Sequence, residues 1–441
     1  MAQVDNTRTQ VMGHVVRRNT WAIAACVCFA CCVISTVLLG IIDTRIALAL
    51  VAAFAIGGLV CALQIKDTRK TEKLHVMENP APLKMLPIAN SLPESFVLYG
   101  RDGSRLSEDT DQCFVMSAKV NKLFTMNPVW ATVPKEMYTL PSQTVPYTVY
   151  LKENRDRELS KFAALRPDKV VMSLHSDIDL DLFRSDHPTI VLQKVSRYAV
   201  QVSDDAFNKV IINRLNDNRP VFCGRDQSIA EDGSLLPLSK AGNTNEIDIH
   251  SLIISSDGYV MFARGTAEHP LRPDKVISSA SCSFLPSELQ NRPVQESMID
   301  SIHNKIRELY EIPEGTSLVS SFCGFSRMIQ RGGAPEFYCL TRIGMTKDEL
   351  IAAHHDPTSE FVDNILSASV PELDDIDDAA RYIADAVNVL RRAVEKDISV
   401  SCSAMLMAVS DAMCDKDQSE KVLLRLGVIE GYVPSSEKAK E

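Results

Sequence analysis

The chain has 441 residues, of which 45% are hydrophobic and 24% charged, so most of it is expected to fold around ordinary cores in two or three domains. The formal net charge of −10 argues against binding of a nucleic-acid polymer, because phosphate contacts need a basic surface. Five of the 12 cysteines lie in apolar runs near the N-terminus, and the other seven have no Cys-x-x-Cys spacing. Scattered cysteines argue against a zinc site and are typical of buried thiols in a reducing compartment.

Two apolar runs near the N-terminus predict a transmembrane hairpin within residues 1–66. Residues 20–42 and 46–63 contain no charged side chain, and about 20 apolar residues suffice to span a bilayer. Basic residues flank both outer ends of the pair, so the positive-inside rule places both termini and the soluble region in the cytoplasm. Taken alone, the hairpin favours a passive anchor over a functional membrane element.

Two segments follow the hairpin. Residues 67–95 are polar and then rich in proline, which predicts an extended linker. Residues 96–220 contain short apolar runs separated by turn residues, which predicts a β-rich region. A helix is expected at residues 205–215, with Asp204 or Asp205 as its N-cap.

Residues 221–345 contain a strand-like run from His250, a turn at 256–258, a second strand ending at Arg264, a helix at about 294–310, and strands near 318–328 and 337–343. This order resembles the Nudix domain, a mixed sheet between helices that normally hydrolyses nucleoside diphosphate derivatives. The resemblance is strongest in the sequence SSDGYVMFARGTA of residues 255–267.

The Nudix family binds Mg²⁺ through carboxylates of a loop and helix, and this chain keeps only part of that pattern. One register matches Glu296 and Glu308 to motif carboxylates but puts Lys305 in place of the main metal-binding Glu. A shifted register recovers Glu311 and puts Ile299 at the first Glu. A Lys ammonium repels a divalent cation, so the resemblance implies a catalytically degenerate domain without cofactor, in which Glu296 and Glu308 are residual carboxylates.

The resemblance also implies a ligand pocket between the first hairpin, the loop at 278–283 and the strands after the helix. Arginines there could pair with phosphates, serine hydroxyls could donate to them, and aromatic rings could stack on bases. Solvated arginines, a polar loop and core aromatics are the structural alternatives. The predicted ligand-binding residues are Arg264, Ser281, Ser283, Phe325, Arg327, Arg331 and Tyr338.

Residues 346–441 are predicted to be helical. Residues 374–396 form the clearest amphipathic pattern in the chain, and shorter helices are expected at 401–413 and 419–426. The predicted fold class is therefore α+β: a transmembrane helical hairpin, a β-rich region, a Nudix-like α/β/α sandwich and C-terminal helices.

The combination of a short hairpin and a degenerate Nudix-like domain resembles the two-transmembrane Nudix-like effectors of bacterial cyclic-oligonucleotide anti-phage systems. This resemblance implies an inner-membrane protein that binds a cyclic di- or trinucleotide, assembles into a homo-oligomer and disrupts the lipid bilayer. One alternative is an active membrane-tethered Nudix hydrolase that uses Mg²⁺. The other is a membrane-anchored structural scaffold without a small ligand.

Overall fold

The computed structural model describes most of the chain beyond residue 73. The described residues are 24, 27, 31, 52–57, 74–105, 112–153, 169–213, 219–266, 274–355, 359–361, 376–394 and 397–427. The chain divides into two compact units. The first comprises Met1–Asn79, Thr139–Ala163 and Asn208–Gly224, and the second comprises Pro80–Tyr138, Ala164–Phe207 and Arg225–Glu441.

The predicted transmembrane hairpin requires correction. Within the described part of the chain, no helix is both long and apolar enough to cross a membrane. Most of residues 20–63 lies outside the described residues.

The first unit contains an antiparallel sheet in the order β1-β7-β8, with the helix α5 (Val145–Glu153). Its strands are β1 (Leu74–Glu78), β7 (Lys209–Asn213) and β8 (Arg219–Cys223). The helix predicted at 205–215 is therefore wrong, because β-branched Val210, Ile211 and Ile212 pair with strands on both sides. β1 lies within the segment predicted as a linker.

The second unit is built on a seven-stranded mixed sheet in the order β10-β9-β15-β14-β3-β2, with β13 also paired to β9. β9 and β15 run parallel, and the other pairs are antiparallel. The strands are β10 (Val260–Met261), β9 (Asp248–Ile254), β15 (Ala334–Ile343), β14 (Leu318–Met328), β3 (Cys113–Met116), β2 (Val97–Gly100) and β13 (Ala280–Ser283).

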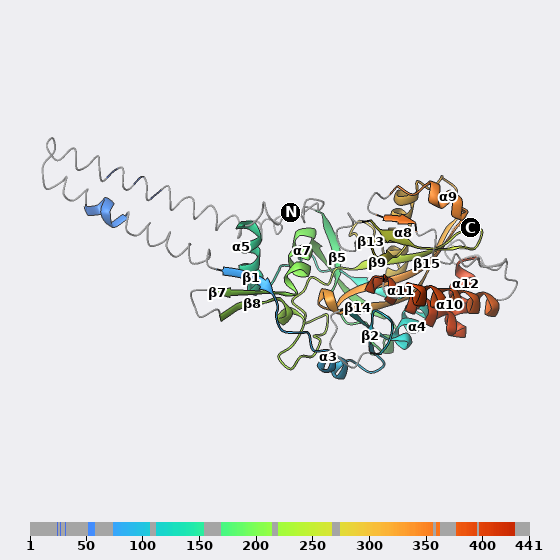
Figure 1. Cartoon of the computed structure of the whole chain (residues 1–441), viewed down its shortest axis with the longest axis horizontal. Helices are drawn as coiled ribbons and strands as arrows, with labels where there is room; N and C mark the ends of the chain where they lie inside the picture. The colour runs from blue at the N-terminus through green and yellow to red at the C-terminus, as the bar shows by residue number, and fades with distance from the viewer. Residues whose placement is uncertain are drawn as a thin grey trace. The chain divides into compact units, whose positions relative to one another are not determined.

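Helices cover both faces of this sheet (Figure 1). Side chains alternate across a strand, so Ile249 and Ile253 of β9 pack in one core with α8 (Val294–Tyr310) and α4 (Ala118–Met126). Leu252 and Ile254 point the other way and pack in a second core with three C-terminal helices. These are α10 (Ile376–Ala393), α11 (Val400–Cys414) and α12 (Lys416–Arg425).

The helices predicted at 294–310, 374–396, 401–413 and 419–426 are thus confirmed to within a few residues at each end. Their apolar spacing follows the 3.6-residue period of a helix that buries one face, or of a helix that is buried all round in the case of α11. The C-terminal helices form one layer of the sandwich rather than an appendage, since their apolar residues share a core with the sheet.

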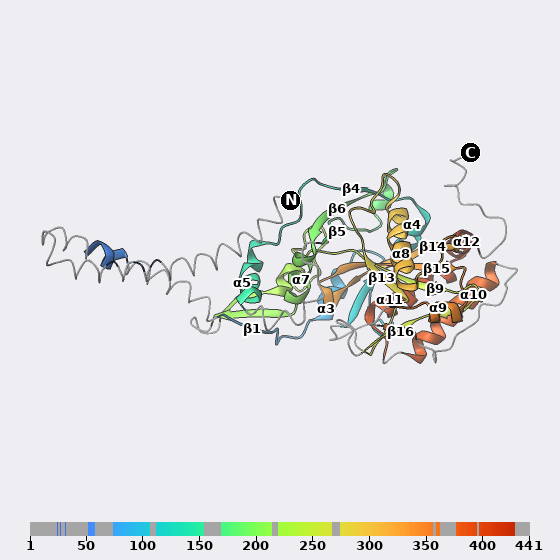
Figure 2. The same ribbon diagram turned by 90° about the horizontal axis from the view of Figure 1, so that it is seen from above.

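Smaller elements surround the sandwich (Figure 2). One small sheet pairs β12 (Val276–Ile277), β11 (Ala263–Gly265) and β16 (Ser359–Phe361), and another pairs β4 (Trp130–Thr132), β6 (Thr189–Ser196) and β5 (Val170–Leu174). The remaining helices are α3 (Met85–Ser91), α7 (Arg197–Ala206) and α9 (Lys347–Ala352). The Ser196 side chain caps α7 by accepting a hydrogen bond from the Ala199 N–H, so β6 leads directly into this helix.

Candidate functional site

The hairpin between β14 and β15 places Arg331 at the end of the sheet. Its turn consists of the short 3-10 helix η6 (Ile329–Arg331) and two glycines with positive φ, Gly332 at 66° and Gly333 at 81°. A Cβ atom on Gly332 would lie 1.7 Å from Nδ2 of Asn243 and 2.6 Å from Oγ of Ser228, so any other residue here would adopt an unfavourable φ and displace these side chains. The turn thereby fixes the backbone from which the Arg331 side chain projects.

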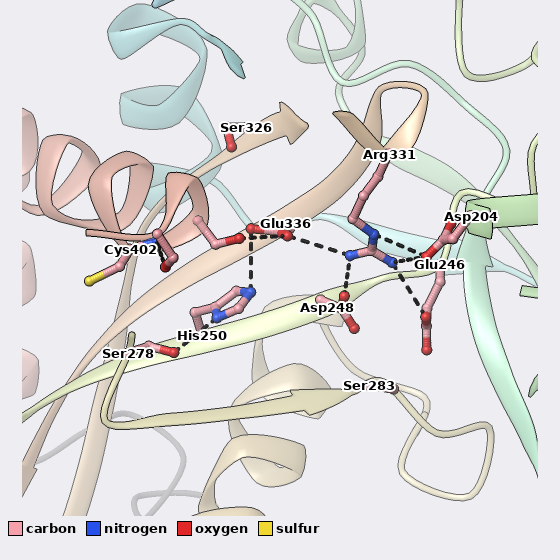
Figure 3. Close-up of polar contacts among 12 residues, drawn as sticks. Asp204, Glu246, Asp248, His250, Ser278, Ser283, Ser326, Arg331, Glu336 and Cys402 are labelled. Atoms are coloured by element: carbon pink, nitrogen blue, oxygen red, sulfur yellow. Dashed lines mark hydrogen bonds and ion pairs between the residues drawn. The ribbon is translucent and has the colours of Figure 1, made fainter. Parts of the chain in front are cut away.

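The Arg331 guanidinium lies among the carboxylates of Asp204, Glu246, Asp248 and Glu336 (Figure 3). We call Arg331, these four carboxylates and the side chains that contact them the Arg331 cluster. Oδ2 of Asp204 accepts hydrogen bonds from Nε at 3.1 Å and from a terminal nitrogen at 3.0 Å. Asp248 accepts a hydrogen bond from the other terminal nitrogen. Glu246 and Glu336 lie 3.5 Å and 3.4 Å from the guanidinium.

The pleat of β9 and its pairing with β15 bring these side chains together. Asp248 and His250 lie two residues apart on the face of β9 that meets α11, and Glu246 continues the same alternation just before the strand. In the parallel register Glu336 pairs with Asp248, and Tyr338 pairs with His250. Paired residues on neighbouring strands have Cβ atoms roughly 5 Å apart, so two carboxylates lie side by side.

Polar contacts extend the cluster toward α11. Glu336 accepts a hydrogen bond from the Ser401 hydroxyl at 3.0 Å, and the Tyr338 hydroxyl lies 3.5 Å from its other oxygen. The His250 ring shares a hydrogen bond of 3.0 Å with Ser278 through Nδ1. Its Nε2 lies 3.4 Å from Glu336 and makes no hydrogen bond with any described residue. Glu336 therefore accepts hydrogen bonds from α11, from η6 and from its own strand.

A second arginine, Arg197, also belongs to the cluster. Arg197, the first residue of α7, donates to the Glu246 carboxylate and lies 3.1 Å from the Ser283 hydroxyl of β13. The Arg197 side chain is 25% exposed and that of Glu246 only 1%, so the arginine forms the accessible rim and the carboxylate lies inside.

Burial and like charge act on Glu246 together. Desolvation, followed by the neighbouring Asp248, raises the pKa of Glu246 to about 7, and the favourable charges of Arg197 and Arg331 only partly oppose this. Burial also acts against the charge of Arg331, but the surrounding carboxylates outweigh it and raise its pKa well above the ordinary value. Strongly perturbed groups that converge from separate segments are typical of functional sites.

Three of the seven predicted ligand-binding residues lie in this cluster, namely Ser283, Arg331 and Tyr338. Their role as ligand contacts stays a prediction. The sequence pattern did not single out Arg197, Glu246, Asp248, His250 or Glu336 as site residues. The sequence does contain a pattern that indicates these residues. Polar residues at 246, 248 and 250 alternate with isoleucines shortly before the apolar residues 252–254, which is typical of a strand with one polar end.

The other predicted ligand residues lie elsewhere. Arg327 donates to the backbone carbonyls of Gly333 at 3.0 Å and Leu236 at 2.8 Å, and burial lowers its pKa to about 10. Phe325 is 1% exposed and stacks on Phe337 in the core beneath α8, on the opposite face of the sheet from Tyr338. These side chains are committed to the fold of the hairpin and its core.

Arg264 and Ser281 lie on short strands away from the cluster contacts. Arg264 of β11 donates to the backbone carbonyl of Asp274 at 3.3 Å, and Ser281 is exposed on β13. Their predicted contact with a ligand therefore receives no support from hydrogen bonding to the cluster.

The residual Nudix carboxylates diverge along α8. Glu296 lies in its first turn and Glu308 in its last, and their sequence separation of 12 corresponds to about 18 Å of helix. Lys305 lies 3.3 Å from Glu308, and Glu311 follows the helix in a left-handed conformation, 3.2 Å from His355. Among the described residues, no group of three or more His, Cys, Asp or Glu side chains could hold a metal ion.

Comparisons with known proteins add little to this geometry. No protein-family model matches the chain, and no curated protein matches it. Among solved structures the chain is similar to DR0079 from Deinococcus radiodurans, with 12% identity, over 34% of this chain and 82% of that chain. The TM-score of 0.19 is too low to support an argument about fold or function. The Nudix-like and effector resemblances therefore stay predictions.

Proposed function

We propose that this protein is a receptor that binds a cyclic di- or trinucleotide without hydrolysing it. The observation that carries the proposal is the contact between Lys305 and Glu308 on α8, at the position where a Nudix hydrolase would gather metal-binding carboxylates. Mg²⁺ takes oxygen ligands that converge at about 2.1 Å. An ammonium group beside Glu308, with Glu296 about 18 Å away along the helix, opposes such convergence.

The rim of the Arg331 cluster offers contacts that suit a nucleotide. Arg197 and the Ser283 hydroxyl, 3.1 Å apart, present donors of the kind that bind phosphate. Asp204 and Asp248, whose side chains are 32% and 20% exposed, present acceptors for the amino groups of bases. The surplus of carboxylates around Arg331 disfavours a phosphate there, so we assign the phosphate to Arg197.

Calorimetric titration of the full chain with a panel of cyclic di- and trinucleotides, in buffer containing Mg²⁺, tests this assignment. We expect saturable binding to at least one member and recovery of that ligand intact by chromatography. Arg197→Gln should weaken binding by about 1.5–3 kcal/mol, the contribution of a charge-assisted hydrogen bond. Arg292→Gln, which alters an arginine paired with Asp300 on α8, is the matched control and should leave binding unchanged.

Two outcomes would overturn the proposal. Flat titrations across the whole panel would favour the scaffold alternative. Turnover that Glu308→Gln abolishes would instead favour the hydrolase and would require a metal site that includes this residue.

Self-assembly on ligand binding is the second part of the proposal. A ligand that binds an assembled state more tightly than the free chain shifts the population toward assembly by its differential affinity. Light scattering with and without the bound nucleotide measures this directly, and an unchanged mass would remove assembly from the account. Membrane disruption depended on the predicted hairpin and is not part of the proposal.

A further inference from the structure

The Arg331 cluster contains more negative than positive groups. Four carboxylates lie around the Arg331 guanidinium (Figure 3), and one of them also contacts a second guanidinium. They are Asp204 from α7, Glu246, Asp248 from β9 and Glu336 from β15, and the guanidiniums are those of Arg197 from α7 and Arg331 from η6. Full ionisation of these six groups would give the cluster two more negative than positive charges.

Two features make that surplus costly. Glu246 and Glu336 are 1% and 0% exposed, so water cannot screen their charge. Asp248 and Glu336 are register partners on adjacent strands, which holds two carboxylates side by side. A buried charge without full compensation costs several kcal/mol, and such a group binds a proton instead of remaining ionised.

Burial distinguishes Glu246 from the two aspartates. Asp204 and Asp248 accept hydrogen bonds from Arg331, and their side chains are 32% and 20% exposed, so water also solvates them. Glu246 is 1% exposed, lies 3.5 Å from Arg331, contacts the partly exposed Arg197, and faces the charges of Asp204 and Asp248. It is therefore the carboxylate on this side of the cluster that water solvates least.

We propose that the Arg331 cluster is a pH-responsive element that binds a proton on Glu246. Release of this proton at alkaline pH leaves repelling carboxylates between α7, β9 and β15 and loosens their junction. The inference is independent of nucleotide binding, because the proton is the only ligand that it requires.

The direction of the pH effect follows from the carboxyl group. Burial raises the pKa of Glu246 from its ordinary value of 4.5 to about 7. The folded chain therefore binds more protons than the unfolded chain between these values, and the free energy of unfolding falls as pH rises through that window. Asp204, Asp248, Arg197 and Arg331 face Glu246 and shape this shift, with the carboxylates raising its pKa and the arginines lowering it.

Glu246→Gln in the full chain tests the proposal, since glutamine resembles the protonated acid. The measured quantity is the thermal midpoint of the variant minus that of the wild type. We expect this difference to increase by roughly 2–8 °C when the pH is raised from about 5 to about 8. Asp300→Asn, which removes a carboxylate that is 42% exposed, is the control and should show a nearly constant difference. A difference for Glu246→Gln that is also constant across this range would overturn the proposal.

A second measurement serves if the glutamine variant fails to fold. Infrared spectroscopy detects the carbonyl stretch of a protonated, buried carboxyl group in a chain that retains Glu246. The spectrum should be recorded on the Asp411→Asn variant, because burial also raises the pKa of Asp411, to about 6. The band should be present at about pH 6 and disappear by about pH 9, and its absence at the lower pH would contradict proton binding by the cluster.

Discussion

Helix α8 and the Arg331 cluster carry similar numbers of charged side chains but arrange them in opposite ways. On α8 the acidic groups come from one continuous segment and lie far apart or pair locally, as Glu308 does with Lys305. In the Arg331 cluster they come from α7, from β9 and the residues just before it, and from β15, and they meet around one guanidinium. Carboxylates at a motif-like spacing along one helix therefore do not form a site. Carboxylates that separate segments bring together around a buried guanidinium do.

The largest difference between the two regions should appear on removal of one cation from each. Arg331→Met leaves four carboxylates without the guanidinium that each of them approaches, and we expect a loss of about 3–5 kcal/mol in the free energy of unfolding. Arg292→Met removes a partly exposed pair with Asp300 and should cost at most about 1 kcal/mol. Urea denaturation of both variants measures the contrast, and similar losses would show that the cluster is no more than a surface network.

The turn that positions Arg331 gives the next largest effect. Gly332→Ala puts a Cβ atom at φ 66°, 1.7 Å from Nδ2 of Asn243, and should destabilise the protein by about 2–3 kcal/mol. Gly315→Ala is the matched control, because Gly315 has φ 90° but nothing within 4 Å of the added atom. The control should lose less free energy of unfolding. Equal losses in denaturant unfolding would show that the Asn243 side chain moves away easily from the added atom.

The α8 side of the sheet should respond to pH in the opposite sense from the cluster. Burial, followed by the charge of Arg307, lowers the pKa of His303 to about 4, and its Nε2 lies 2.8 Å from the Ser320 hydroxyl. Since the unfolded chain takes up this proton first, wild-type stability is lost as pH falls from about 6.5 to about 4.

His303→Gln keeps a donor for Ser320 but removes the titration, so the variant should gain on the order of 1–2 kcal/mol relative to the wild type over that interval. Denaturant unfolding at several pH values measures the gain. His355→Gln, at a histidine that is 52% exposed, is the control. A parallel pH dependence of wild type and His303→Gln would contradict the assignment.

The smallest effect is expected on α8 itself. Glu308 is 72% exposed and pairs with Lys305 three residues earlier, so Glu308→Gln should change the free energy of unfolding by less than about 0.5 kcal/mol. A thermal or urea unfolding curve suffices to check this. A larger loss would mean that Glu308 has a structural partner beyond the helix surface.

Much of the fold was predictable from local periodicity. The helices α8 and α10 follow their apolar spacing closely, and the Gly-Gly turn between β14 and β15 lies where two glycines allow positive φ. The prediction failed at residues 205–215, because acidic residues that suggest an N-cap precede a β-branched run whose pairing with β1 and β8 determines its structure. Strand pairing is long-range, so no local pattern reveals it.

The candidate site was only partly predictable, for the same reason. Arg331, Ser283 and Tyr338 were expected to share a site, and they do lie in one cluster. Glu336 and Asp248 become neighbours only through the parallel register of β15 with β9, across about 90 residues of chain. The C-terminal helices contribute Ser401, which a strictly modular interpretation of the sequence assigns to another domain.

Whether the Arg331 cluster behaves as one coupled unit is tested most directly by a double-mutant cycle of Arg331→Met and Glu246→Gln. Urea unfolding of both single variants, the double variant and the wild type at about pH 8.5, where Glu246 is ionised in the wild type, gives the interaction free energy. Each single variant already loses the attraction between the Glu246 carboxylate and Arg331, so the double variant should be at least about 1 kcal/mol more stable than additivity predicts. Additivity within about 0.3–0.5 kcal/mol would contradict the account.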